Sequence, residues 1–411
     1  MNKNMKKIIL AVSIIYLIII SCVTDGVTRK REPQSITIFT VKTPVAGNYP
    51  QGLFKYPYKP DSFEQEFFTQ TIEWEPRVQK TFDVNTKYTA VITLDSINRI
   101  NAFQNMTVDN IIGLPSDGVE NITVDVKSRS LIIKILFNQT ANQKAQPQLI
   151  FYDEFNTNTL DTSKWDLCPE WDRQGRSSWR DDMVSVNGGM LHLKFKRDTA
   201  LGKEKSANNT SISNNWIRAG AVRTMTKDMG ILFQNTFGYY EARIKFPSVM
   251  GTWGAFWLMS PTQWMLGDEG IDGTEIDIIE TIHNQEGRYN AALNWNGYDR
   301  FQKSVHSSAI SLPLHDNDII PVNIFDGEFH IIALDWSPSE YIFYVDGKVL
   351  WRVDGGSEFK NSGINRNPNY IKLTIEGSSW VGNLPENFNE AEMLVDYVRV
   401  YNQPLINKSK N

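Results

Sequence analysis

The chain has 411 residues, 41% hydrophobic and 22% charged, so it can bury a large core and disorder of the whole chain is excluded. Its formal net charge is −5, and loss of the first 21 residues, with three lysines and no acid, takes it to −8. So acidic a chain lacks the basic surface that nucleic-acid binding needs, and highly sulfated ligands are disfavoured unless a local basic pocket receives them.

Aromatic residues make up 12% of the chain, with 12 Trp, 15 Tyr and 21 Phe. Most large rings belong to hydrophobic cores. The number is nevertheless typical of proteins that stack flat rings against a ligand, and sugar rings are one such ligand.

The N-terminus is a targeting signal. A basic start is followed by the apolar run Ile8–Ile20, which is too short to span a bilayer comfortably, and then by Ser21 and Cys22. Ser21-Cys22 resembles the lipobox of bacterial lipoproteins, although an ordinary cleaved signal with an incidental cysteine is the alternative. We expect a signal peptide over residues 1–21, acyl chains on Cys22, and a tether over 22–32. The protein is then an exported lipoprotein of the bacterial cell envelope, at the outer membrane or the cell surface.

Cys168 is the only other cysteine in the sequence. If Cys22 carries lipid, no intrachain disulfide is possible and the fold depends on its core. No residues of metal-ligand type are spaced around Cys168, so neither a metal nor a nucleophile role is expected for it.

Residues 33–137 contain short alternating runs separated by Asn, Asp, Gly and Pro, such as SITIFTV, KYTAVITL and NITVDVKSRSLIIKILF. This pattern predicts a small β-sandwich accessory domain without a catalytic constellation. It is either a spacer or packing module, or a carbohydrate-binding module. The polar, aperiodic stretch 138–147 is predicted to be a linker.

Residues 148–403 carry strand signals throughout and no repeats, including GYYEARIKF, GAFWLM, EIDIIETI, HIIALDW and MLVDYVRVY. One large β-sandwich accounts for them, followed by a tail over 404–411. The pair Asp346-Gly347 between apolar runs predicts a two-residue hairpin turn.

Three acids lie close together in the stretch GTEIDIIE. Glu275 and Asp277 are two apart, so a strand places both on one face and isoleucines on the other. Glu280 follows at an odd spacing, which in a regular strand would put its carboxylate among those isoleucines at a high free-energy cost. One extra residue at Ile278-Ile279, a β-bulge, returns Glu280 to the first face. We predict that all three carboxylates line one cleft.

Clustered carboxylates repel one another, so at least one should have a raised pKa. A protonated acid beside an ionised carboxylate is the pair that glycoside hydrolysis requires, one protonating the leaving oxygen and the other attacking the anomeric carbon. The triplet therefore predicts a glycosidase site.

The pattern Glu-x-Asp-x-x-Glu, with its bulge, resembles that of glycoside hydrolase family 16. The resemblance extends over about 148–403, through the segments YDEFNTNTLDTSKWDL, FGYYEARIKFP, GTWGAFWLM, FHIIALDWSPSEYIFYVDGK and VDYVRVYN. It implies an all-β, concanavalin A-like jelly-roll sandwich and a retaining double displacement. Glu275 would be the nucleophile, Asp277 its assistant and Glu280 the acid/base.

The resemblance also implies substrate-binding residues. Arg223 stands where relatives often present a cleft arginine. Asn294 stands where a histidine is common in relatives and is also a candidate binding residue, although the role of that histidine is not carried over to it. Four tryptophans are candidate stacking platforms, each of which could equally be a core residue: Trp253, Trp257, Trp295 and Trp380.

The sequence leaves the substrate open between glucans and galactans, with β-1,3 or β-1,4 linkages. Relatives that cut β-glucan commonly read Trp-Pro-Ala where this chain has Trp253-Gly254-Ala255, and the insert 260–273 is unexpected for a plain laminarinase. Agar-like and β-1,3-galactan chains therefore remain candidates.

No cofactor is expected to be required and no catalytic metal is predicted. Relatives often bind a structural calcium on the convex face, with Asp396 as the implied ligand here. We expect a monomer that acts on a polysaccharide. A non-catalytic surface glycan-binding lipoprotein of the same fold and a transglycosylase, in which a sugar hydroxyl intercepts the glycosyl-enzyme, are the competing functions.

Overall fold

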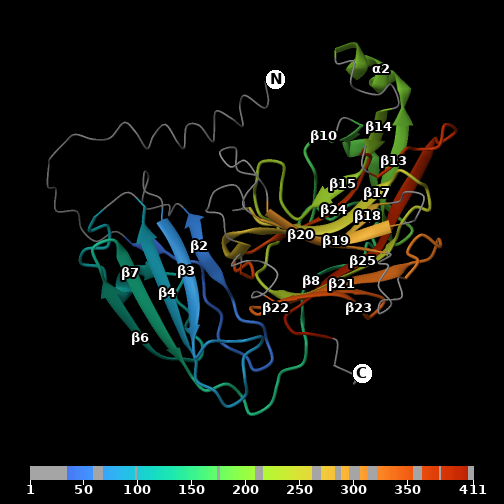
Figure 1. Ribbon diagram of the computed structural model, residues 1–411. Helices are drawn as coiled ribbons and strands as arrows, with labels where there is room; N and C mark the ends of the chain where they lie inside the picture. Colours follow the sequence, from blue (N-terminus) through green and yellow to red (C-terminus); the bar gives the residue numbers. More distant parts are fainter. Residues whose placement is uncertain are drawn as a thin grey trace, which may run out of the picture. The chain divides into compact units, whose positions relative to one another are not determined.

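The structure is a computed structural model that describes residues 35–58, 68–97, 100–173, 176–208, 216–261, 270–282, 288–295, 306–312, 322–354, 363–378 and 381–405. The predicted signal peptide, the tether and Cys22 lie outside the described residues. The described part is almost entirely β (Figure 1). None of its helices is long and apolar enough to cross a membrane.

A small β-region forms the N-terminal part of the described chain. Its main sheet has five antiparallel strands in the order β2-β3-β4-β7-β6, and a short parallel pair, β1 with β5, accompanies it. The elements are β1 (Ile36–Thr37), β2 (Leu53–Tyr58), β3 (Phe68–Glu75), β4 (Thr89–Ser96), the 3₁₀ turn η1 (Val108–Asn110), β5 (Ile111–Ile112), β6 (Val119–Val126) and β7 (Ser130–Phe137).

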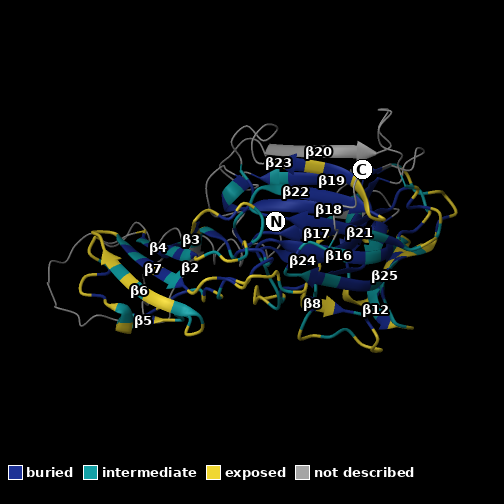
Figure 2. Ribbon diagram, turned by 90° about the horizontal axis from the view of Figure 1, so that it is seen from below, coloured by how far each residue is buried: buried dark blue, intermediate teal, exposed yellow. Residues whose placement is uncertain are grey.

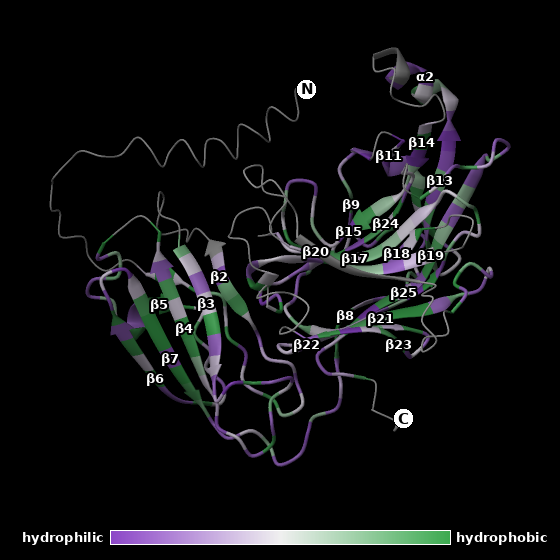
Figure 3. Cartoon of the chain, in the orientation of Figure 1, coloured by the Kyte–Doolittle hydropathy of each residue, from purple (hydrophilic) through white to green (hydrophobic). Residues whose placement is uncertain are grey.

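Strict alternation builds this sheet. Along β4 every second residue is buried, and Ala90, Ile92 and Leu94 are fully inaccessible to solvent, whereas their neighbours are partly exposed. β7 is mostly hydrophobic in Figure 3, and the edge strand β6 is largely exposed in Figure 2. The small sheet therefore has one face in a core and the other towards solvent.

The segment 138–148 contains no strand before β8. Backbone hydrogen bonds nevertheless hold it to the small region: the N–H groups of Asn138, Thr140 and Ala145 donate to the carbonyls of Gly118, Thr86 and Ala46 at 2.7, 2.9 and 2.9 Å. The connection thus runs along the small region instead of leaving it directly.

The large domain has two packed sheets. The first contains eleven strands, β10-β11-β14-β13-β25-β16-β21-β22-β23 with β12 beside β13 and β8 beside β25. Its elements, with two short helices, are β8 (Leu149–Asp153), β10 (Asp172–Arg173), β11 (Ser177–Trp179), η2 (Asp181–Met183), β12 (Val184–Asn187), β13 (Met190–Asp198), α2 (Thr199–Asn208), β14 (Trp216–Ala219), β16 (Gly238–Lys245), β21 (His330–Trp336), β22 (Glu340–Val345), β23 (Lys348–Asp354) and β25 (Glu390–Tyr401).

The second sheet has seven strands in the order β20-β19-β18-β17-β24-β15-β9. They are β9 (Asp166–Leu167), β15 (Ala221–Arg223), β17 (Trp253–Met259), β18 (Thr274–Ile282), β19 (Arg288–Trp295), β20 (His306–Leu312) and β24 (Tyr370–Glu376), with η3 (Gly270–Asp272) just before β18. Side chains of both sheets form one hydrophobic core, in which Trp165 and Trp336 are fully buried. The predicted all-β sandwich is confirmed.

The predicted hairpin joins β22 to β23. Val345 pairs with Lys348, and the two turn residues have φ angles of 50° at Asp346 and 75° at Gly347. Two positive φ angles in a row are what a two-residue turn between right-twisted strands needs, and Asp-Gly tolerates them.

The middle of the seven-stranded sheet differs from every strand of the small sheet. All residues of β17 and β24 are buried, as are those of β18 except Glu280, which is partly exposed (Figure 2). One face of these strands packs on the core, so the other must also be covered, and its residues include charged ones.

Candidate active site

β18 contains the predicted bulge. Its register with β17 shifts between Phe256 and Trp257, which lie opposite Ile279 and Asp277, so Ile278 is the extra residue. The register with β19 shifts over the same residues. The bulge restores parity and places all three acids of the triplet on one face, which confirms the prediction.

Neutral donors hold the three carboxyl groups. The amide of Asn294, which lies opposite Glu275 on β19, donates to Asp277 Oδ2 at 2.8 Å and to Glu275 Oε1 at 3.3 Å. The indole N–H of Trp253 on β17 donates to Glu280 Oε1 at 3.0 Å. Asn294 therefore links the first two acids, while Trp253 orients the third.

Burial and mutual repulsion set the protonation of this group. Burial, together with the charge of Glu275, raises the pKa of Glu280 to about 8. Burial and the charges of Glu280 and Glu275 also raise the pKa of Asp277 well above its usual range. Glu280 therefore keeps its proton at neutral pH, as a general acid must.

A buried lysine lies on the same face, two strands away. Lys372 of β24 is opposite Trp257 of β17 and opposite Arg223 of β15. Its Nζ lies 3.6 Å from the ring centroid of Trp257 and 4.8 Å from that of Trp179. Among the described residues, the Lys372 amine has neither an ion-pair partner nor a hydrogen-bond partner. Burial lowers the pKa of Lys372 to about 8, and its charge in turn acts to lower the pKa of Asp277.

An arginine and a glutamate adjoin the acid. Arg173 Nε donates to Glu376 Oε2 at 2.6 Å, and Glu376 lies opposite Trp253 in the sheet. The guanidinium carbon of Arg173 is 4.6 Å from the ring centroid of Trp179 and 5.9 Å from that of Trp171, which is 55% exposed. A charged pair and an accessible aromatic ring thus lie near Glu280, at one end of the sheet face that carries the three acids.

This arrangement has the parts for acid-assisted attack at an anomeric carbon. Glu280 supplies a proton. Glu275, which lies on the other side of the bulge in β18, supplies a nucleophile or a negative charge. Both belong to one strand, so their separation is fixed by the backbone.

The family profile described as β-porphyranase A–D, glycoside hydrolase family 16 domain, matches residues 147–403. The chain belongs to glycoside hydrolase family 16. It is 25% identical over 270 residues to a β-glucanase of Rhodothermus marinus, covering 62% of this chain and 85% of that one. To a keratan-sulfate endo-1,4-β-galactosidase of Sphingobacterium multivorum it is 27% identical over 301 residues, 71% and 63% of the two chains. It is also 33% identical over 169 residues, 39% and 34% of the two, to β-porphyranase D of Zobellia galactanivorans. Its family homologues are endo-glycosidases, and the chain is an endo-acting glycoside hydrolase.

Solved structures of family 16 enzymes are also similar. One is the catalytic domain of an endo-1,3-β-glucanase (laminarinase) from Thermotoga petrophila, with a TM-score of 0.47, 20% identity and coverage of 63% of this chain and 98% of that one. Another is LamAcat from Zobellia galactanivorans, with a TM-score of 0.45, 22% identity and coverage of 62% and 97%.

The structure brings together most of the predicted binding residues of this family 16 site. Trp253 and Trp257 share the cleft face with the triplet. Arg223 does too, but its Nε and Nη2 donate to the carbonyls of Met225 and Thr226 at 2.9 and 2.6 Å. Arg223 thus secures a turn, and Lys372 covers one side of the Trp257 ring.

One predicted tryptophan is not brought to the carboxylates, and another is not described. Trp295 lies opposite Thr274, one residue from Glu275, so its side chain starts from the other face of the sheet. Trp380 lies outside the described residues.

The position implied for calcium contains an ion pair. Asp396 Oδ2 accepts a hydrogen bond from Arg243 Nη1 at 2.6 Å, so a guanidinium already compensates the carboxylate. No group of three or more His, Cys, Asp or Glu residues suited to a metal occurs in the described part of the chain. The structural calcium implied by the family resemblance stays a prediction. Cys168 is buried, and burial raises the pKa of its thiol.

Sequence reasoning missed three charged residues of the site: Lys372, Glu376 and Arg173. The first two had a detectable signal, because the stretch Tyr370–Glu376 reads YIKLTIE and alternates polar with aliphatic residues. Alternation predicts a strand with two distinct faces, but not that both are buried. Arg173 belongs to the two-residue strand β10, which is too short to carry a comparable signal.

Proposed function

We propose that this chain cleaves internal β-linkages of a galactan that carries sulfate esters, with retention of configuration. The observation that carries the mechanism is the protonated Glu280 beside Glu275 on one bulged strand. The observation that carries the substrate class is the buried lysine on the same sheet face, together with the match to the porphyranase family.

In the first step the Glu275 carboxylate attacks the anomeric carbon while Glu280 transfers its proton to the departing glycosidic oxygen. A covalent glycosyl-enzyme forms and the aglycone half of the chain leaves. In the second step Glu280, now ionised, removes a proton from water, and the resulting attack on the anomeric carbon releases Glu275. Asn294 donates hydrogen bonds to both Asp277 and Glu275 and so holds Glu275 in the attacking position.

The substrate class follows from charge. Lys372 is 6% exposed, and no acidic side chain among the described residues pairs with it, whereas Arg173 is paired with Glu376. A buried cation on the sheet face of the three carboxylates, in a protein with net charge −5, is suited to an anionic substituent. Sulfated galactans such as porphyran and keratan sulfate offer one, and the names of two relatives carry those substrates.

The substrate proposal is tested by digesting a panel of laminarin, mixed-linkage glucan, agarose, porphyran, carrageenan, β-1,3-galactan, keratan sulfate and mucin, with product sizing. We expect a sulfated galactan to be cleaved at least tenfold faster than its chemically desulfated form. Lys372→Met should remove that preference, while the surface control Lys196→Met should keep it. A neutral glucan as the best substrate would overturn the proposal.

The mechanism is tested by the configuration of products. With Glu280→Ala and an activated aryl glycoside, added azide should restore turnover and give a β-glycosyl azide. An α-configured azide would reverse the roles of the two glutamates. Products longer than the substrate would reveal transglycosylation, in which a sugar hydroxyl replaces water in the second step.

We further propose that the chain is exported and held at the outer membrane of a bacterial envelope by acyl groups on Cys22. The support is the sequence of residues 1–22. Cys22→Ala should release the protein from the membrane fraction without changing turnover of a soluble substrate. Cys168→Ala, as the control, should remain in that fraction. Persistent membrane association of Cys22→Ala would point to another anchor.

A further inference from the structure

Three asparagines of the segment Asn365–Asn369 are completely buried although their side chains are polar. Asn365, Asn367 and Asn369 are each 0% exposed. Buried amides must find hydrogen-bond partners. Those of Asn367 come from two different parts of the chain.

On one side, Asn367 forms hydrogen bonds with the small β-region. Its Oδ1 accepts a hydrogen bond from the backbone N–H of Phe54 at 2.8 Å, and its Nδ2 donates to the carbonyl of Phe54 at 3.0 Å. Phe54 belongs to β2, whose register with β3 is interrupted between Leu53 and Tyr56. That irregularity leaves the backbone groups of Phe54 available to Asn367.

On the other side, the same segment holds the entry to the catalytic strand. Asn367 Nδ2 donates to the carbonyl of Asp272 at 2.6 Å, and Asn369 Nδ2 donates to that of Thr274 at 2.8 Å. The N–H of Arg366 donates to the carbonyl of Ile271 at 3.0 Å. Thr274 directly precedes Glu275, so three hydrogen bonds fix the backbone from which the nucleophile projects.

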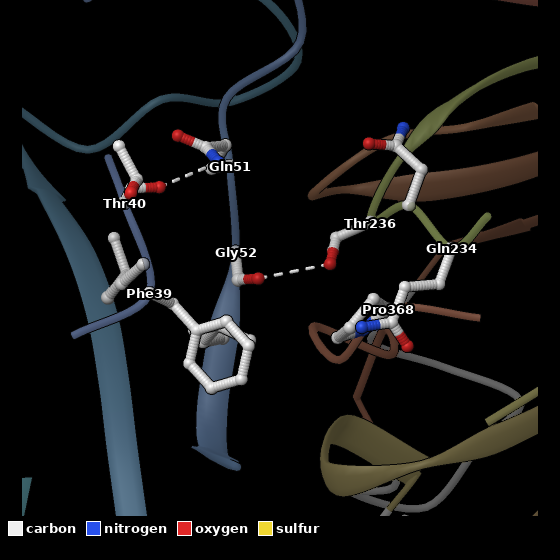
Figure 4. A pocket seen from close by; sticks show the side chains of 10 residues that line it. Phe39, Thr40, Gln51, Gly52, Gln234, Thr236 and Pro368 are labelled. Carbon is white, nitrogen blue, oxygen red and sulfur yellow. Dashed lines mark hydrogen bonds between the residues drawn. The ribbon is translucent and has the colours of Figure 1, made fainter. Parts of the chain in front are cut away.

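The contact beside Asn367 is close and can be wedged apart. Thr236 Oγ1 donates to the carbonyl of Gly52 at 3.0 Å, next to a cavity of about 160 Å³ (Figure 4). A Cβ added at Gly52 would lie 3.0 Å from the Phe237 ring and 3.1 Å from the carbonyl oxygen of Arg366. Any side chain at position 52 therefore presses on the segment that holds β18.

We propose that Asn367 is a positioning residue that couples the small β-region to the strand carrying Glu275. The small region is then a structural part of the catalytic unit and not a free spacer or an independent binding module. This inference rests on the proposed role of Glu275 as nucleophile. A misplacement of a reacting group by about 1 Å can lower turnover about 100-fold, so a loosened support should reduce kcat.

The test compares three variants of the full chain. Asn367→Ala removes the hydrogen bonds to Phe54 and Asp272. Gly52→Val instead places a side chain against Phe237 and the carbonyl of Arg366, and it leaves the amide of Asn367 in place. Tyr49→Phe is the matched control, because the Tyr49 hydroxyl also ties the small region to the large domain, but through Asp335 of β21 at 2.6 Å. Each variant is assayed for kcat, KM, thermal stability and hydrogen exchange of peptides covering 270–282.

We expect Asn367→Ala and Gly52→Val to lower kcat 10- to 100-fold with KM changed less than threefold, and to speed exchange at the start of β18. Tyr49→Phe should leave kcat and that exchange unchanged even if its Tm falls. Wild-type kcat in both test variants, or an equal loss of kcat in Tyr49→Phe, would overturn the coupling. If Asn367→Ala does not fold, Gly52→Val decides.

Failure of the proposed function would look different. Without any polysaccharide cleaved by the wild-type chain, the hydrolase assignment of this site fails, while the exchange data still report whether β18 depends on the small region. Unchanged exchange at 270–282 in both test variants overturns the coupling whatever the substrate.

Discussion

A central strand of the small five-stranded sheet and one of the seven-stranded sheet differ in which of their residues are buried. In β4 of the small sheet, alternate residues are buried and the others meet solvent. In β24 of the large domain every residue is buried, although Lys372, Thr374 and Glu376 alternate with aliphatic residues just as regularly. A strand that buries a polar face needs partners for each polar group, and those partners here are the parts of an active site. A buried polar face therefore distinguishes the functional sheet from the supporting one.

The largest expected effect is on catalysis, when a carboxylate of the buried polar face is replaced. Glu275→Gln should leave the fold and oligosaccharide binding intact but lower kcat about 1,000-fold or more, because the covalent route is lost. The matched change on the supporting sheet, Glu73→Gln at an exposed position of β3, should leave kcat unchanged. Activity near wild type in Glu275→Gln would refute the assignment of the nucleophile.

A one-residue deletion should affect the two sheets in different ways. Removal of one isoleucine from Ile278-Ile279 gives the strict alternation Glu-Ile-Asp-Ile-Glu, so the acids keep one face and activity should fall but stay measurable. Removal of Ile92 from β4, where the register has no bulge, would turn the buried residues after it to solvent and should unfold the small sheet. Circular dichroism melts and turnover measure both.

An insertion sharpens the same comparison. One residue added after Ile279 would send Glu280 towards the apolar face, where its ionised form has no partner. Turnover should vanish and Tm should fall together. An insertion variant with wild-type turnover would show that the acid/base is not held on this strand face.

The pH dependence should be set by the buried face. Glu280 is protonated in the folded protein up to a pKa of about 8, so kcat should fall about tenfold per pH unit above that value. The stabilising effect of its native proton is complete below the unfolded pKa of about 4.3 and is lost as pH rises through about 8.

Glu280→Gln cannot lose a proton, so its stability should decline less between pH 5 and pH 9 than that of the wild type. The difference in the free energy of unfolding should be on the order of 4 kcal/mol, since about three pH units lie between pH 5 and the folded pKa and each corresponds to about 1.4 kcal/mol. Denaturant titrations at the two pH values measure it. Equal declines would mean that Glu280 ionises freely in the fold.

The smallest expected effect comes from a buried charge away from the cleft. Burial opposes the charge on His330, but hydrogen bonds to Asp346 at 2.8 Å and Asp326 at 3.0 Å outweigh it and raise the pKa of the histidine. The stabilisation is present below the unfolded pKa of about 6.5 and is lost as pH rises through the folded value. His330→Gln should therefore cost about 1 kcal/mol at pH 6 and less at pH 9, with kcat unaffected.

The sequence by itself determined the features that depend on residues only a few positions apart. Two-residue spacing, the cost of burying a lone carboxylate and a run of isoleucines were enough to predict the bulge at Ile278-Ile279 and the shared face of the three acids. The Asp346-Gly347 turn was predictable for the same reason, because its φ requirement involves only adjacent residues. The fold class followed from many such strands in succession, with the family resemblance added to them.

Only the tertiary structure decided which residues stand beside that face. Lys372 reaches it because β24 pairs with β17, more than a hundred residues earlier in the chain, and Trp295 leaves it because of the register of β19 with β18. The support of Glu275 by Asn367 joins three segments that are remote in sequence. Strand order and register are set by the packing of whole sheets, which no local period contains, so the partners of the three acids could not be read from the alternation that placed the acids themselves.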